Sequence, residues 1–212
     1  MNLEVTGVTE PPNRYDIRDK MALALLGAGF IASWTYAFLQ RVSPQTVSLS
    51  FMQDFGADAG GVAMLASSYF WGYTLMQIPA GLLVDRYGVK RVVLFSMLAS
   101  SLGSAAFALA PNLLDVFVAR LIVACGDALV FTALLKLVAQ NFSDERFGIM
   151  SGISQVSGYV GGVLATTPLA AAVSGFGWRA CFVFIACVGA TGGWSCGYHA
   201  ICVHDDKRPD AG

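Results

Sequence analysis

Charged residues of this 212-residue chain gather in short clusters that separate long apolar segments. Five segments carry no charge at all: 21–40, 59–84, 92–114, 147–178 and 180–204. Each can cross a hydrocarbon layer of about 30 Å, which takes about 20 helical residues. A sixth segment, 116–135, is equally apolar although it holds Arg120 and Asp127. Because lipid satisfies no backbone hydrogen bond, the pattern predicts six transmembrane helices.

The six segments predict an all-α membrane protein with little structure outside the bilayer. The bundle is expected to occupy residues 21–202, between a polar N-terminal tail, 1–20, and the closing residues, 203–212. The expected helices are 21–44, 60–84, 90–110, 113–136, 147–173 and 179–202. Loops this short leave no room for a soluble domain between the helices.

Composition agrees with lipid as the main solvent. Apolar residues make up 56% of the chain and charged residues 13%, whereas a soluble domain has about 25% charged residues. A net charge of −1 provides no basic surface for nucleic acid. The five cysteines show no C-x-x-C spacing and are interpreted as packing residues, so neither a metal nor a cofactor is expected.

Lysine and arginine predict the orientation of the bundle, because cytoplasmic loops are enriched in them. Most fall on one side: Arg14, Arg18, Lys20, Arg86, Lys90, Arg91, Lys136, Arg146, Lys207 and Arg208. The opposite side has only Arg41 and Arg179. Both termini are therefore expected in the cytoplasm. The polar start of the chain does not read as a signal peptide, so the first apolar segment is kept as a helix.

Short segments in the two halves of the sequence resemble each other at an offset of about 90 residues. Residues 67–72 resemble 157–162, and Gly88 precedes a basic pair much as Gly177 precedes Trp178 and Arg179. Three helices per copy would place the second copy upside down, which is the 3+3 inverted repeat of secondary transporters. Small residues also recur every four positions and predict close helix packing: Ser154, Gly158 and Gly162, and Ser96, Ser100 and Ser104.

The junction between the second and third helices carries the most specific motif. Its fixed positions are Gly81, Asp85, Arg86, Gly88, Lys90 and Arg91. The segment resembles the G-x-x-x-D-R-x-G-x-[KR]-[KR] signature of the major facilitator superfamily and falls where that family has it. Further resemblances lie at Tyr73–Pro79, at Arg120 with Gly126, in the glycine-rich fifth helix, and at Gly177-Trp178-Arg179. The chain is thus similar to the N-terminal six-helix half of the organic-anion and sugar-phosphate:cation symporter group.

The resemblance implies a proton-coupled secondary active transporter with a multi-pass location in a bacterial inner membrane. In the family, the signature acts as a conformational switch at the cytoplasmic ends of two six-helix halves, with the substrate between them. This chain ends at Gly212, where the family's central loop would begin. We therefore expect a fragment, or a half that needs a second six-helix half or another copy of itself.

Two charges inside a predicted helix are the main candidates for function. Arg120 and Asp127 are seven residues apart, on nearly one helix face and about 10 Å apart along the axis. They are too distant for direct contact, so each needs another partner. Either they pair with other helices and fix packing, or Arg120 binds an anion and Asp127 couples protons.

Arg41 either extends to the interface or contributes a second anion-binding guanidinium. The resemblance favours the second reading, because organic-anion permeases of the family have arginines facing the substrate in helices 1 and 4. Gln40 stands where those proteins often have an acid, and it cannot titrate.

Tyr69, Tyr73 and Gln77 form a polar stripe that either lines a cavity or bonds a neighbouring helix. The predicted substrate site comprises Arg41, Tyr73, Gln77 and Arg120, for a small and anionic molecule. The alternative function is a membrane scaffold that transports nothing. An intramembrane protease is excluded because no G-x-S-G motif occurs, so no enzymatic activity is expected.

Overall fold

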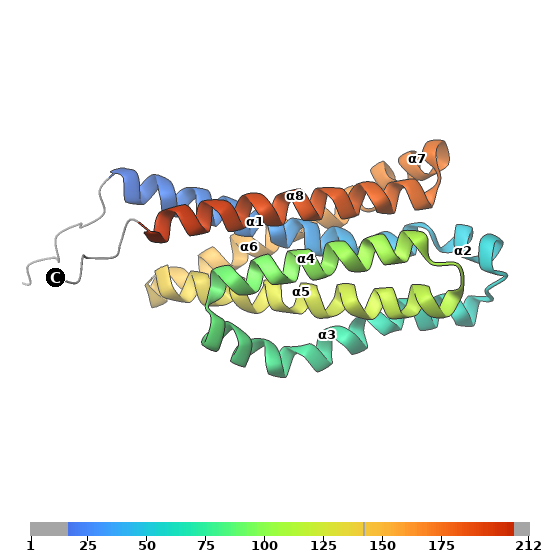
Figure 1. Cartoon of the computed structure of the whole chain (residues 1–212), viewed down its shortest axis with the longest axis horizontal. Helices are drawn as coiled ribbons and strands as arrows, with labels where there is room; N and C mark the ends of the chain where they lie inside the picture. Colours follow the sequence, from blue (N-terminus) through green and yellow to red (C-terminus); the bar gives the residue numbers. More distant parts are fainter. Residues whose placement is uncertain (1–16, 142, 206–212) are drawn as a thin grey trace, which may run out of the picture.

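In the computed structural model, residues 17–141 and 143–205 are described, and they form eight α-helices and no strand. The helices are α1 (Ile17–Thr46), α2 (Ser48–Phe55), α3 (Ala59–Tyr87), α4 (Val89–Leu109), α5 (Leu113–Asn141), α6 (Asp144–Leu164), α7 (Thr167–Phe176) and α8 (Trp178–Asp205). The long helices lie side by side (Figure 1). The predicted tails fall largely outside the described residues, as do Arg14, Lys207 and Arg208.

The expected six helices correspond to α1, α3, α4, α5, the pair α6 and α7, and α8. Within the described residues, length and hydropathy alone identify three candidate membrane spans: Val89–Leu109, Leu113–Gln140 and Phe147–Phe176. A shorter apolar helix follows at Trp178–Gly192. Helix α3 is long enough but less apolar, because glycine, serine and tyrosine occupy much of its middle.

Two predicted helices have different bounds in the structure, and the second difference is explained by proline. Helix α1 was expected to end at Pro44 but continues to Thr46, and the short α2 follows it. The predicted helix 147–173 divides at Ala165 and Thr166, just before Pro168 enters the first turn of α7. Proline lacks an N–H and disfavours helical geometry in the residue before it.

The signature is more compact than the predicted loop. Asp85 and Arg86 belong to the last turn of α3, while Lys90 and Arg91 belong to the first turn of α4. Gly88 alone separates the two helices, with φ 80° and ψ 154°. Only glycine adopts this conformation readily. The motif therefore builds a one-residue corner between two helices.

The packing of the helices follows the predicted inverted repeat. Helix α1 packs on α6 as α5 packs on α3, while α4 and α8 pack on each other. The corner at Gly177 repeats that at Gly88, with φ 80° and ψ 156°. The N–H groups of these glycines donate to Val84 O and Val173 O, at 3.1 and 2.9 Å. The two three-helix units thus share both contacts and corners.

Glycine brings α1 and α6 into close contact. A Cβ on Gly161 would lie 1.9 Å from the carbonyl oxygen of Thr35, so no larger residue fits. The Thr35 hydroxyl donates to Ser157 O at 3.0 Å across this seam. Of the predicted small residues on this helix, Gly158 makes a close contact and Gly162 only an ordinary one, and the closest approach is at Gly161, which the prediction did not include.

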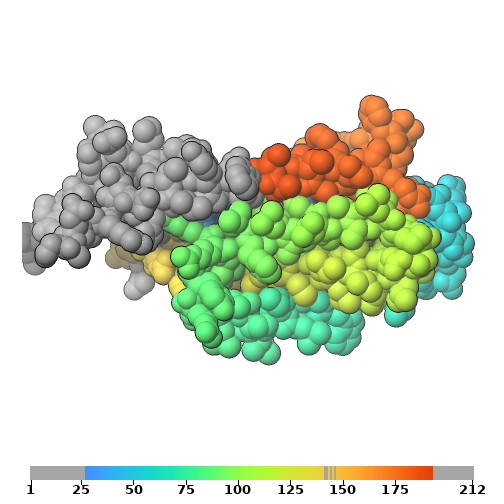
Figure 2. Space-filling view, viewed as in Figure 1, coloured from blue at the N-terminus to red at the C-terminus, as the bar shows by residue number. Residues whose placement is uncertain are grey.

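An aromatic cluster closes the end of the bundle that carries α2, called here the outer end after the predicted orientation. Phe51, Phe107, Trp178 and Phe182 are all buried there and their rings contact one another. Figure 2 shows the side chains of α4 and α5 forming a continuous surface between α8 and α3. The buried core and its polar groups lie behind this surface.

Candidate functional site

Arg120 lies on α5, inside the outer half of the bundle, with only 3% of its surface exposed. Its Nη1 and Nη2 donate to the carbonyl oxygens of Gln40 and Arg41 at 2.7 and 2.8 Å. The Gln40 carbonyl would normally accept from the residue four positions later, which is Pro44 and has no N–H. Proline therefore frees an acceptor on α1 that the guanidinium occupies. Arg120 Nε has no hydrogen-bond partner among the described residues.

Asp127 lies two turns further inward on α5 and is 1% exposed. Its Oδ1 accepts from the Ser100 hydroxyl of α4 at 2.8 Å. Its Oδ2 accepts from the Tyr69 hydroxyl of α3 at 3.0 Å. Within the described part of the chain, neither Asp127 nor Arg120 belongs to an ion pair. Arg120 and Asp127 were expected to find partners elsewhere rather than in each other, and this is confirmed.

Tyr69 joins the two charges, a role that the sequence did not reveal. The Arg120 guanidinium carbon lies 4.5 Å from the centre of its ring, a distance typical of cation–π contacts. The hydroxyl of the same ring reaches Asp127. The only hint in the sequence was the spacing of Tyr69, Tyr73 and Gln77, which was expected either to line a cavity or to bond a neighbouring helix. Tyr69 does the second.

Gln40 holds α1 against two other helices. Its amide nitrogen donates to the Tyr36 hydroxyl at 2.8 Å and to the Ser104 hydroxyl of α4. Tyr36 in turn donates to the carbonyl of Ile185 on α8 at 3.2 Å. The serine stripe of α4 therefore carries polar contacts as well as packing, since Ser96, one turn before Ser100, donates to Gly126 O at 2.6 Å.

Arg41 follows Gln40 but points elsewhere. Its half-buried side chain places the guanidinium carbon 5.5 Å from the ring centre of Phe38 and 5.0 Å from that of Phe70. Tyr73 stacks on Tyr69 with ring centres 5.9 Å apart. The other predicted site residue, Gln77, is half-buried one turn further along α3.

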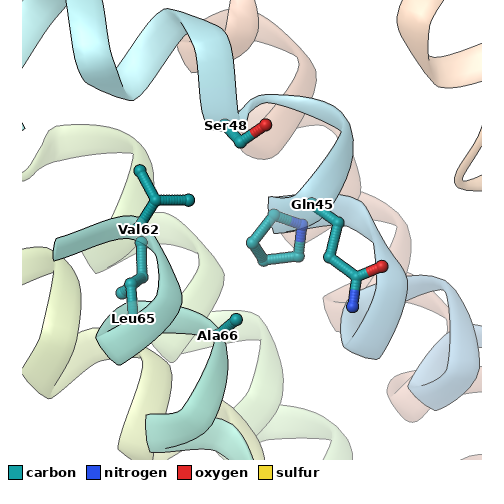
Figure 3. Close-up of a pocket in the computed structure, with 6 residues that line it drawn as sticks. Gln45, Ser48, Val62, Leu65 and Ala66 are labelled. Atoms are coloured by element: carbon teal, nitrogen blue, oxygen red, sulfur yellow. The ribbon is translucent and has the colours of Figure 1, made fainter. Parts of the chain in front are cut away.

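A pocket opens at the outer end between the α1–α2 elbow and α3 (Figure 3). Its volume is about 190 Å³, and it is lined by Pro44, Gln45, Ser48, Val62, Leu65 and Ala66. Neither predicted arginine lines it. Arg41 and Phe70 each lie about one helical turn from its wall along their helices. The pocket thus lies next to the contact between Arg41 and Phe70, on the side of the outer end.

The signature aspartate has a partner within this half. Lys136 Nζ of α5 lies 2.5 Å from Asp85 Oδ1 and also reaches the carbonyl of Val84. In the sequence, Lys136 was counted only among the basic residues of the cytoplasmic side, not as a partner of Asp85. Its pairing depends on how α5 packs on α3, which sequence spacing does not give.

The outer end has an ion pair that the sequence did not indicate. Asp54 Oδ2 accepts from Trp178 Nε1 and from Arg179 Nη1, both at 2.8 Å. These two hydrogen bonds lower the pKa of Asp54 from its ordinary value. They tie α2 to the start of α8, next to the corner at Gly177.

Comparison with known proteins identifies the family. Residues 22–211 match the sequence profile of the Major Facilitator Superfamily. The chain belongs to this superfamily. It is 31% identical over 133 residues to a probable galactarate/D-glucarate transporter of Pseudomonas putida, covering 59% of this chain and 29% of that protein. It is also 31% identical over 181 residues to a multidrug resistance protein B homolog of Mycobacterium tuberculosis, covering 84% and 32%.

A solved structure shows the same fold. The inward-facing, unoccupied bacterial homolog of the lysosomal transporter Spinster aligns with a TM-score of 0.78 at 18% identity, over 85% of this chain and 43% of that one. The chain spans about a third of the length of the curated relatives it matches. The predicted family, the all-α fold and its likeness to half of a major-facilitator protein are confirmed. The superfamily member is an integral, multi-pass membrane protein, and its relatives are transporters rather than enzymes.

Proposed function

We propose that this superfamily member forms one half of a secondary transporter that moves a small organic anion with protons. The observation that carries the proposal is the pair of intramembrane arginines. Arg41 and Arg120 form no ion pair within the described residues, and Arg120 keeps an N–H without a partner. Charges inside a membrane are costly and mark substrate or ion pathways.

Sugar acids are the substrate class that we propose. The galactarate/D-glucarate relative supports this choice, and a sugar dicarboxylate presents planar groups that guanidinium binds through two parallel hydrogen bonds. Arg41, Tyr73 and Gln77 are half-buried and extend along α1 and α3 from the outer pocket inward. Together with Arg120 they form the proposed substrate site.

Asp127 is the proposed proton-coupling group. It is the buried carboxylate of the described membrane-spanning helices, and both of its oxygens are held by hydroxyl groups rather than by a cation. A hydroxyl can hold either protonation state, because it both donates and accepts hydrogen bonds. This environment supports reversible protonation without loss of the local packing.

A second six-helix half is the proposed partner, in the same polypeptide or in another copy. Helix α3 exposes Trp71, Leu75 and Ile78, and α6 exposes Val156 and Val160. These faces meet either lipid or another protein surface, and the half-buried polar groups lie beside them. We further propose the cell inner membrane as the location, with both termini in the cytoplasm.

The α3–α4 corner is the proposed conformational switch. The Asp85–Lys136 pair is partly exposed, so it can break at modest cost. Arg86 and Arg91 are exposed beside it, Lys90 is half-buried, and Gly81 has open space around it. Rearrangement of these charges would accompany movement of the two halves.

Uptake into liposomes tests the proposal. The chain is reconstituted together with its second half, joined in the same polypeptide or as another copy, an inside-alkaline pH gradient is imposed, and entry of labelled D-glucarate is measured. We expect saturable uptake that collapses with a protonophore and is lost in Arg41→Gln and Arg120→Gln. Arg179→Gln, at the outer ion pair, is the matched arginine control and keeps uptake. A correctly inserted assembly of both halves that neither binds nor takes up D-glucarate would favour the non-transporting scaffold.

A further inference from the structure

One side chain makes contact with both proposed functional charges. The Tyr69 ring lies 4.5 Å from the Arg120 guanidinium carbon, and its hydroxyl donates to Asp127 at 3.0 Å. Tyr69 is 2% exposed, so water does not compete for either contact. The two charges, seven residues apart on one helix, therefore contact the same residue of another helix.

The ring transmits displacement because it is rigid and tightly packed. A tyrosine hydroxyl is fixed in the plane of its ring, so the hydroxyl cannot move without the ring face moving. Tyr73 stacks on one side at 5.9 Å, and Phe70 meets the ring edge-on at 5.8 Å. Val123 and Ala124 of α5 complete the buried contacts. A displacement of the Tyr69 hydroxyl would therefore also displace the ring face that contacts the Arg120 guanidinium.

Protonation of Asp127 changes what it offers Tyr69. The ionised carboxylate accepts charge-assisted hydrogen bonds from Tyr69 and Ser100, and these are stronger than bonds to a neutral acid. The protonated acid must donate one hydrogen itself. Ser100 can turn its own hydrogen to the nearby Val123 carbonyl, 3.4 Å away. Tyr69 has no second acceptor among the hydrogen bonds of the described residues, so its hold on the acid weakens.

We propose that Tyr69 is a positioning residue that links protonation of Asp127 to anion binding by Arg120. The inference deepens the proposed function and rests on it. With Asp127 ionised, the hydroxyl bond fixes the ring and the guanidinium above it. With Asp127 protonated, the ring is released and Arg120 can reorient its free N–H toward an anion. Anion and proton binding would then favour each other.

Other charged and titratable groups surround this carboxylate and are part of the same equilibrium. Arg120 and Arg41 lie within electrostatic range of Asp127, as do Tyr36, Tyr69 and Tyr73. Arg120, Arg41, Tyr36 and Tyr73 all persist when only the Tyr69 hydroxyl is removed. The comparison below therefore isolates the hydroxyl rather than the surrounding field.

Two substitutions separate a link from a simple loss of a hydrogen bond. Tyr69→Phe removes a donor to Asp127 but keeps the ring beneath Arg120. Ser100→Ala removes the other donor, which has no contact with Arg120. Infrared spectroscopy follows the protonated carboxyl band with pH, and Asp127→Asn identifies that band. D-glucarate binding to the full chain is measured over the same pH range. Tyr159→Phe serves as the tyrosine control, because the Tyr159 ring packs on Phe38 and keeps that contact as phenylalanine.

We expect both variants to move the midpoint of the carboxyl band upward, by about one pH unit, because each loses a hydrogen bond that favours the ionised form. Only Tyr69→Phe should weaken the dependence of D-glucarate affinity on pH, while Ser100→Ala keeps the wild-type dependence, displaced along the pH axis. Tyr69→Leu, which also removes the ring, should lower affinity throughout. Tyr159→Phe should change neither readout.

Three results would overturn the inference. An unshifted band midpoint in Tyr69→Phe would show that its hydroxyl does not hold the carboxylate. Equal loss of pH dependence in Tyr69→Phe and Ser100→Ala would show a general electrostatic effect instead of a link. A wild-type chain that binds D-glucarate with the same pH dependence as Tyr69→Phe would show that the hydroxyl carries no link. If instead the wild-type protein binds no D-glucarate at any pH, the proposed function itself fails.

Discussion

The seam between α1 and α6 makes a quantitative prediction at Gly161. An alanine Cβ there would lie 1.9 Å from the Thr35 carbonyl oxygen, whereas carbon–oxygen contacts need about 3.3 Å. The helices must separate by about 1.4 Å, the difference between these distances. The neighbouring Gly162 has 3.8 Å to its nearest atoms, so alanine fits without movement. The two substitutions differ in position by one residue and in chemistry not at all.

The energetic difference should be large. Inserting a methyl group into a packed seam costs about 1–3 kcal/mol or more, and separation also stretches the Thr35–Ser157 hydrogen bond. Helix propensity favours alanine over glycine by up to about 1 kcal/mol at both sites. We expect Gly161→Ala to be less stable than Gly162→Ala by about 2 kcal/mol or more, roughly a 30-fold difference in the folded-to-unfolded ratio.

Equilibrium unfolding by SDS in mixed micelles, followed by tryptophan fluorescence, measures this difference. Trp34 reports on the seam directly, because its indole nitrogen would lie 2.7 Å from a Cβ on Gly158. Gly162→Ala should unfold at or above the wild-type SDS concentration. Equal stability of the two alanine variants would refute the close approach of α1 and α6.

Three further predictions concern the ends of the bundle. Lys136→Ala removes a partly exposed ion pair and should lower the free energy of unfolding by less than about 1 kcal/mol, measured in the same assay. Gly88→Leu places a side chain at φ 80°, so it should cost about 1–3 kcal/mol and reduce uptake, with membrane fractionation showing normal insertion. The pKa of Asp54 is lowered by the hydrogen bonds from Trp178 and Arg179, so its stabilising contribution is complete above its ordinary value and is lost as pH falls through the lowered one. Asp54→Asn should therefore flatten the fall in Tm between about pH 5 and pH 2.

The sequence predicted the long helices, the inverted repeat and the family, because lipid imposes long apolar segments and the signature occupies fixed spacings. It did not predict the short α2 or the break between α6 and α7. Arg120 and Asp127 were also identifiable, since charges are conspicuous in apolar helices. Their partners were not, because helix rotation and depth arise from packing between distant segments. The same holds at the outer end, where Asp54 and Trp178 form a hydrogen bond although they are 124 residues apart.

Pro44 shows how a local residue acts on a distant one. The first helix was expected to end at residue 44, and the proline there was given no role. Its physical effect instead falls four residues earlier, where the carbonyl of Gln40 loses its donor. Arg120 supplies that donor from α5, so α1 continues to Thr46. Pro44, near the end of α1, thus indicated where the Arg120 guanidinium of α5 binds.

The contacts of α5 also suit the order in which the chain is synthesised. Among the described residues, the hydrogen-bond partners of Arg120 and Asp127 all precede them in sequence: Gln40, Arg41, Tyr69 and Ser100. A charged side chain entering the membrane centre costs about 2.5–3.5 kcal/mol on insertion scales. When α5 leaves the ribosome, α1, α3 and α4 have already been made and offer acceptors and donors for both charges. The costliest helix of the bundle can therefore enter the bilayer beside its partners, before α6 and α8 are complete.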